Sequence, residues 1–145
     1  MPDRGRHESE TVERLLDSNL SSVDRAEEIA SGLAQLAGFD EDDLMKIGIA
    51  VREAVVNAVV HGNRYNEKKK VRFSVVKNSE RLTVRVADEG EGFEFEHLPD
   101  PLAPENLLRA SGRGIFLIRS FMDELEIRRL EPGGTELVLT KYKDK

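Results

Sequence analysis

Apolar residues recur along this chain with two different periods, and each change of period marks a new element. From Val23 to Leu36, and again from Leu44 to Val59, apolar positions follow one another every three or four residues, which predicts two successive amphipathic helices. Gly38 is expected to end the first helix, and Asp40 is expected to cap the start of the second. The second helix is expected to run to about His61.

Strict alternation of apolar and polar residues predicts the strands. Val71–Val76 and Leu82–Ala87 alternate on either side of a polar turn, so we expect an antiparallel hairpin with one buried face. Leu125–Leu130 and Thr135–Thr140 alternate again around a Pro–Gly–Gly turn signal. Thr11–Asp17, whose period is ambiguous, is interpreted as an edge strand.

The stretch between the two strand pairs has a different character. Phe93–Ser111 contains three prolines and no clear period, and a loop of this length in a compact domain is usually functional, such as a lid. A short helix is expected from Gly112 to Met122. The order β–α–α–β–β–loop–α–β–β predicts an α+β two-layer sandwich, with a mixed, mostly antiparallel sheet of about five strands and three helices on one face. We expect residues 1–9 to be a disordered tail and residues 10–145 to form a single domain.

Composition narrows the class of protein. The 145 residues carry a net charge of −6, with 39% hydrophobic and 34% charged residues, which is typical of a soluble globular protein. The negative charge argues against broad binding to nucleic acid backbones. No apolar run is long enough to span a membrane, and no signal-peptide core opens the chain. The sequence has no cysteine, which excludes thiolate chemistry and fits a reducing cytoplasm.

A polar stripe interrupts the second predicted helix. Glu53, Asn57 and His61 are spaced four apart, so they lie on one side of a helix that is otherwise mostly apolar. A carboxylate and a carboxamide are costly to bury without partners, so this placement indicates either a structural network or a ligand. His61, near the helix end, is interpreted as a group that interacts with the helix dipole.

Three glycine-containing elements follow. Asp88-x-Gly90-x-Gly92 comes directly after a strand, and is either a tight turn or a place where the backbone approaches a flat ligand. In the second case the carboxylate can accept a hydrogen bond from the exocyclic amine of adenine. Gly112-x-Gly114 at a helix start is either a flexible connection or a phosphate-binding helix N-terminus. The third element, residues 133–135, is on its own only a hairpin turn, and no P-loop motif occurs.

Taken in order, these elements resemble the N, G1, G2 and G3 boxes of the GHKL (Bergerat-fold) ATPase and kinase superfamily. The likeness extends from about Thr11 to Tyr142. Within the superfamily, residues 53–62 and 111–125 look most like the stand-alone serine kinases that act as anti-sigma factors in bacteria. Two-component histidine kinases share the boxes but add a helical hairpin bearing a phospho-accepting histidine, which residues 1–10 are not expected to form.

The resemblance implies a role for each matching residue. Asn57 would hold Mg²⁺ through its side-chain oxygen, and Glu53 would be the catalytic general base that accepts a proton from the attacking hydroxyl. Asp88 would recognise the adenine of ATP, and Thr135 would support it through a water molecule. Gly90 would let the backbone approach the nucleotide.

The same resemblance implies roles around the expected lid. Gly92 would also allow close approach of the backbone, and Gly112–Gly114 would face the phosphates as the lid closes. Arg113 is the preferred candidate for a cation near the γ-phosphate, with Arg109 and Lys68–Lys70 as alternatives. The sequence does not choose among these basic residues.

The implied function is that of an ATP-dependent serine/threonine protein kinase acting as a cytoplasmic anti-sigma factor. It would phosphorylate a STAS-type anti-anti-sigma partner, bind a sigma factor, and form a homodimer through an apolar face of Thr11–Asp17 or of the first helix. No direct contact with nucleic acid or membrane is expected. The alternative is a nucleotide-gated binding or regulatory module with little or no kinase activity, and a weaker one is a subunit that phosphorylates His or Asp through a partner.

Overall fold

The computed structural model describes residues 9–90, 114–131 and 133–143. The elements of these residues, in chain order, are β1 (Glu10–Asp17), α2 (Ser21–Ala37), α3 (Glu41–Val56), the π-helical segment η1 (Asn57–Gly62), β2 (Lys70–Lys77), β3 (Arg81–Ala87), α5 (Gly114–Phe121), β4 (Glu124–Arg129) and β5 (Thr135–Tyr142). Each helix and strand predicted from the apolar pattern is present, with ends shifted by a few residues.

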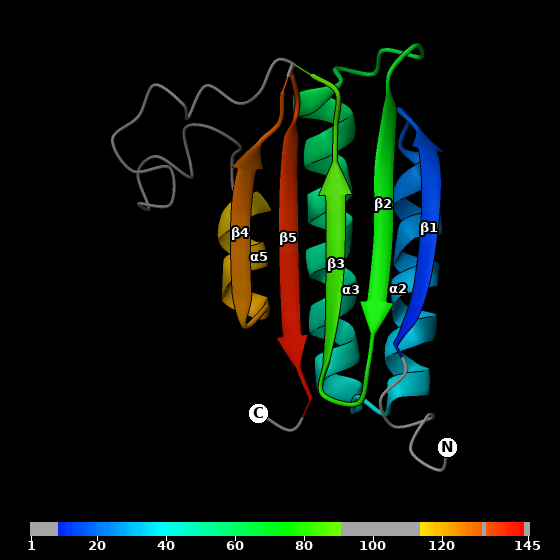
Figure 1. Cartoon of the computed structure of the whole chain (residues 1–145), viewed down its shortest axis with the longest axis vertical. Helices are drawn as coiled ribbons and strands as arrows, with labels where there is room; N and C mark the ends of the chain where they lie inside the picture. Colours follow the sequence, from blue (N-terminus) through cyan, green and yellow to red (C-terminus); the bar gives the residue numbers. More distant parts are fainter. Residues whose placement is uncertain (1–8, 91–113, 132, 144–145) are drawn as a thin grey trace.

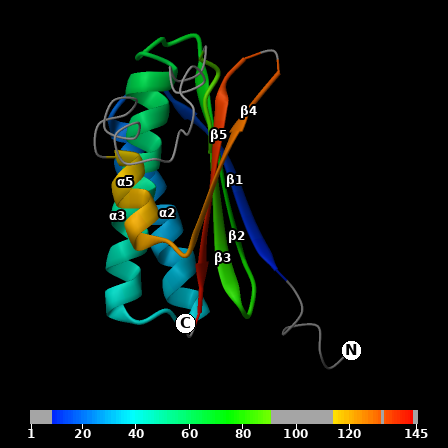
Figure 2. The same ribbon diagram turned by 90° about the vertical axis from the view of Figure 1, so that its left-hand side faces the viewer.

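The molecule has two layers (Figure 1). One layer is a five-stranded sheet in the order β1-β2-β3-β5-β4. The helices α2, α3 and α5 cover one of its faces, and none of the described helices covers the other (Figure 2). The predicted α+β two-layer fold is therefore confirmed. No helix among the described residues is long and apolar enough to cross a membrane.

Within the described strands, each pairing is antiparallel, although a mixed sheet was expected. The reason lies in the connections. The pair α2 and α3 returns the chain to the end of the sheet where β1 stopped, so β2 runs back beside it. Strands β3 and β4 do run in the same direction, but β5 lies between them and pairs with both.

The core lies between the sheet and the helices. Strand residues that alternate towards the helices meet in register, as in the pairs Val75 with Val84 and Val84 with Leu139. Buried alanines at positions 26, 30 and 34 of α2 repeat every four residues along one side of that helix. Such small side chains let neighbouring helices pack closely against each other and against the sheet.

The predicted helix ends are confirmed at Gly38 and Asp40. Gly38 has a φ of 94°, a left-handed conformation that glycine adopts without strain. The Asp40 carboxylate accepts a hydrogen bond of 2.9 Å from the Asp43 N–H at the start of α3.

The second helix differs from the prediction. It is α-helical only to Val56 and widens into η1, where the Asn63 N–H donates to Ala58 O at 2.8 Å, five residues back. Apolar periodicity does not reveal one extra residue in the final turn of a helix. Such π-helical turns are frequent at functional sites.

Candidate functional site

Three segments that are distant in sequence meet at one end of the sheet: the π-helical end of the second helix, the end of β3 and the start of β5 (Figure 1). The Asp88 N–H donates to Thr135 O at 3.0 Å, which joins the two strand ends. The polar residues singled out in the sequence at positions 57, 88 and 135 are each buried here.

Asp88 is the best-defined group of this site. Its side chain is 3% exposed, and its Oδ1 accepts hydrogen bonds from the N–H groups of Gly90 at 2.9 Å and Thr135 at 3.2 Å. Burial raises the pKa of Asp88 above its ordinary value, and the two N–H donors oppose that rise. The carboxyl group is thus held in one orientation inside a largely water-free cradle.

The cradle of Asp88 is built from glycines. A Cβ on Gly62 would overlap the Asp88 carboxylate, and a Cβ on Gly90 would overlap the carbonyl oxygen of Gly62. Gly134 has a φ of 115°, and a Cβ there would overlap the carbonyl oxygen of Asp88. The close approach of these backbone segments to Asp88 and to one another requires glycine at these positions.

Gly90→Ala is expected to destabilise the fold by about 3 kcal/mol, because the new methyl group has no space beside Gly62. The matched control is Gly32→Ala, in the middle of α2, where nothing lies within 4 Å of an added Cβ. That substitution is expected to raise stability by about 0.5–1 kcal/mol. Urea unfolding of both variants measures the two changes, and a loss of similar size in both would contradict the packing argument.

Glu53 and Asn57 lie side by side, as their spacing on one helix predicts. A Cβ on Gly114, the first residue of α5, would lie 3.1 Å from both Glu53 Oε1 and Asn57 Nδ2. Glu53 is half-buried and Asn57 is 2% exposed. The glycine at the start of α5 therefore leaves room beside a carboxylate and a carboxamide.

Two buried polar atoms of the described residues lack hydrogen-bond partners: Asn57 Nδ2 and Thr135 Oγ1. A buried polar group without a partner costs about 1–3 kcal/mol. Both atoms belong to residues that the sequence marks as binding residues, one beside Glu53 and one beside Asp88. An amide N–H donor and a hydroxyl without partners are suited to a polar ligand such as a phosphate or water. A cation such as Mg²⁺, which prefers hard oxygen ligands, would be held by the other end of the Asn57 carboxamide, its side-chain oxygen.

Other predicted residues lie elsewhere. Gly92, Arg109 and Gly112–Arg113 fall outside the described residues. The ammonium group of Lys70, one of the alternative cations, pairs with Asp17 at 2.6 Å. His61 is exposed in the last turn of η1. Among the described residues, no group of three or more His, Asp or Glu side chains is arranged to hold a metal ion.

Sequence reasoning missed two residues of the site. The sequence assigns no role in the site to Gly62 or Asn63, yet Gly62 lies against Asp88, and the Asn63 side chain accepts a hydrogen bond from the N–H of Glu89 at 2.7 Å. The Asn63 contact joins positions 26 apart in sequence. No local sequence pattern predicts such a contact, because the contact depends on how β3 is placed beside the end of η1.

The comparisons with known proteins agree with this geometry. Residues 16–141 match the histidine kinase-like ATPase domain family, so the chain belongs to that family. The serine-protein kinase RsbW of Halalkalibacterium halodurans is 31% identical over 142 residues, covering 94% of this chain and 85% of that protein. RsbW of Bacillus velezensis is 36% identical over 122 residues, covering 77% of this chain and 72% of that protein.

A solved structure is also similar. The RsbU and RsbW domains of a Mycobacterium tuberculosis protein match with a TM-score of 0.67 and 19% identity, over 94% of this chain. The present chain spans 33% of that longer chain, and the likeness shows the fold. The resemblance to GHKL proteins, and within them to serine protein kinases, is thus confirmed, and use of ATP follows from the family.

Proposed function

We propose that this protein is an ATP-dependent serine/threonine protein kinase that acts as an anti-sigma factor in the cytoplasm. Its acceptor is a serine or threonine of a STAS-domain anti-anti-sigma protein, and its second partner is a sigma factor. The observation that carries the proposal is the placement of the Glu53 carboxylate beside the buried carboxamide of Asn57, whose Nδ2 has no hydrogen-bond partner among the described residues, next to the first residue of α5.

Each end of the site has its own task. Bound ATP and Mg²⁺ supply the phosphoryl group and much of the charge neutralisation, which dominate this kind of transfer. Asn57 offers its side-chain oxygen to the metal, and Glu53 accepts the proton of the attacking hydroxyl. Gly114 keeps side-chain volume away from both groups. Residues 10–145 would form the single domain that does this work.

At the other end, Asp88 selects the base. A carboxylate accepts a hydrogen bond from the exocyclic amine of adenine, whereas guanine carries a carbonyl oxygen at the corresponding position. Asp88 is already fixed by two backbone donors, so little order is lost on binding. The unpartnered Thr135 hydroxyl lies beside it and supports the same interaction through a water molecule.

The test is transfer of label. The protein is incubated with γ-labelled ATP, Mg²⁺ and a purified STAS-domain partner, and acid-stable label on a serine or threonine of that partner is expected. Chelation of Mg²⁺ is the control and should abolish transfer. Acid-labile label would instead indicate a histidine or aspartate acceptor. Absence of any transfer, with ATP-dependent partner binding retained, would favour a nucleotide-gated binding module.

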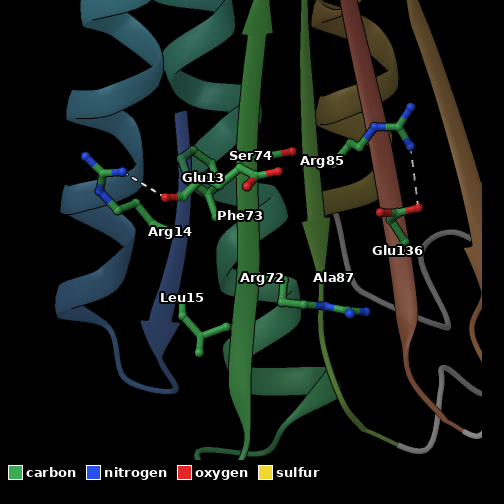
Figure 3. Close-up of a pocket in the computed structure, with 9 residues that line it drawn as sticks. All are labelled: Glu13, Arg14, Leu15, Arg72, Phe73, Ser74, Arg85, Ala87 and Glu136. Atoms are coloured by element: carbon green, nitrogen blue, oxygen red, sulfur yellow. Dashed lines mark hydrogen bonds and ion pairs between the residues drawn. The ribbon is translucent and has the colours of Figure 1, made fainter. Parts of the chain in front are cut away.

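The open face of the sheet supports the homodimer that we include in this proposal. It carries a hollow of about 530 Å³ over β1, β2, β3 and β5, on the side away from the helices (Figure 3). Arg85 and Glu136 pair across it at 3.7 Å. Leu15 on β1 is 66% exposed at its edge, and Arg72 has no ion-pair partner among the described residues.

A second copy of this chain fits such a face, because it offers both an unpaired arginine at position 72 and an unpaired glutamate at position 13 within the described chain. A two-fold axis would place Arg72 of one copy beside Glu13 of the other, and Glu13 of the first beside Arg72 of the second. Sedimentation equilibrium gives the mass in solution. A monomer at all accessible concentrations would overturn the dimer without affecting the proposed kinase activity.

A further inference from the structure

Asn63, the residue after η1, has a side chain whose hydrogen-bonding groups are all in use. It is 2% exposed. Its Nδ2 donates to Ser18 Oγ at 2.9 Å and to the carbonyl oxygen of Lys70 at 3.1 Å, and its Oδ1 accepts from the Glu89 N–H at 2.7 Å. One amide therefore joins the β1–α2 connection, the start of β2 and the turn after β3.

The contact with Glu89 matters most, because Glu89 lies between Asp88 and Gly90. The turn that presents the Asp88 carboxylate is thus held from behind by the Asn63 side chain. A second hydrogen bond holds the same turn, from the Lys70 N–H to Glu89 Oε2 at 2.9 Å. This bond is exposed to solvent, and exposed hydrogen bonds contribute less to stability than buried ones. The Ser18 hydroxyl extends the buried network by donating to the Lys69 carbonyl oxygen.

The backbone that follows Asn63 is strained, so the position of Asn63 is maintained at a cost in conformational energy. Arg64 and Tyr65 have φ values of 52° and 61°. Two successive left-handed residues other than glycine are unfavourable. The Tyr65 N–H returns to Val59 O at 2.9 Å, which fixes the direction in which the chain leaves the helix. Strained backbone of this kind clusters at functional sites.

We propose that Asn63 is a positioning residue for the base-recognising end of the nucleotide site. It does not contact the nucleotide but acts through the Glu89 backbone, holding Asp88 at the distance from Gly62 at which adenine is accepted. The inference rests on the proposed function. It predicts that Asn63 governs the preference for ATP over GTP, while the phosphoryl-transfer end is set independently by α3, which carries Glu53, and by the first residue of η1, Asn57.

The experiment compares Asn63→Ala with Asn78→Ala. Asn78 holds the turn between β2 and β3 by accepting from the N–H groups of Glu80 and Arg81 at 2.8 and 3.0 Å, so it is an asparagine with a similar structural task far from the site. Binding of ATP and GTP is measured by calorimetry, KM and kcat by phosphorylation of the partner, and folding by thermal melting.

Asn63→Ala is expected to lower the preference for ATP over GTP about tenfold and to raise the KM for ATP, with kcat within about threefold of the wild type. Asn78→Ala is expected to lower the melting temperature without changing the preference. A folded Asn63→Ala protein that keeps the wild-type preference overturns the inference.

A second variant covers failure of the first to fold. Ser18→Ala removes one acceptor of Asn63 and leaves the Glu89 contact in place. It is expected to lower the preference about threefold, and an unchanged preference there overturns the inference as well. If the wild-type protein binds neither ATP nor GTP, the proposed function itself is overturned. If the wild-type protein prefers ATP and the variants keep that preference, only the inference about Asn63 is overturned.

Discussion

Replacing Glu53 by Gln is expected to lower the rate of phosphoryl transfer by about a hundredfold or more, the usual contribution of a positioned general base. Glutamine has nearly the same shape but does not accept the proton of the attacking hydroxyl. Glu53 is half-buried beside Asn57 and Gly114. Because glutamine occupies nearly the same volume there, the packing of α3 against α5 is expected to stay unchanged. Affinity for ATP and the melting temperature should therefore stay close to the wild-type values.

Single-turnover transfer from labelled ATP to the partner measures the chemical step directly. The matched control is Glu27→Gln, which changes another half-buried helical glutamate, one on α2 that pairs with Arg52 of α3 at 2.7 Å. It is expected to keep the transfer rate. Equal rates in Glu53→Gln and the wild type would show that Glu53 is not the proton acceptor.

Asp88→Asn is expected to weaken ATP binding by about a hundredfold, because a charged acceptor is lost and an amide donor can face the amine of adenine instead. The same change is expected to stabilise the nucleotide-free protein at neutral pH. The asparagine oxygen can still accept from the N–H groups of Gly90 and Thr135, while the buried charge disappears. Function and stability are thus opposed at this one position.

The gain in stability that we expect for nucleotide-free Asp88→Asn depends on pH. Burial raises the pKa of Asp88 in the folded protein, so the folded state holds this proton more tightly than the unfolded state. The contribution of Asp88 to the free energy of unfolding is greatest below its pKa in the unfolded state, about 4, and is lost as pH rises through its raised pKa in the folded state. The stability advantage of Asp88→Asn should therefore grow as pH rises from about 4 towards neutral pH.

Thermal melting of the two nucleotide-free proteins across this pH range measures the difference. A variant less stable than the wild type at pH 7 would contradict the interpretation, and so would a difference that stays constant with pH. Calorimetric titration with ATP at pH 7 gives the accompanying loss of affinity.

Periodicity predicted most of the fold because the core is built from regular patterns. The strands that alternate, such as those at 71–76 and 82–87, do bury one face, and the ends at Gly38 and Asp40 follow from local chemistry. The π-helical turn and the fully antiparallel pairing among the described strands were not predictable in this way. Both depend on how the chain closes in three dimensions.

The site was predictable in its residue types but not in its construction. Glu53 and Asn57 share a helix, so their proximity follows from spacing alone. The bond between Asp88 and the Thr135 N–H joins residues 47 apart in sequence, and only the sheet brings them together. The close contact of Gly62 with Asp88 has no signature in the local sequence. The roles given to these residues remain predictions for the experiments above.

The π-helical turn has a consequence for how the two ends of the site are aligned. An α-helix rotates by about 100° with each residue, and η1 closes its hydrogen bonds over five residues instead of four. If the same residues formed a regular α-helix instead, Gly62 and Asn63 would lie about 100° further around its axis, while Glu53 stayed in place. The rotational phase between the proposed catalytic carboxylate and the proposed base-recognising turn is thus set by the wide turn of η1, so the helix geometry of this segment constrains the protein as firmly as the identity of its side chains.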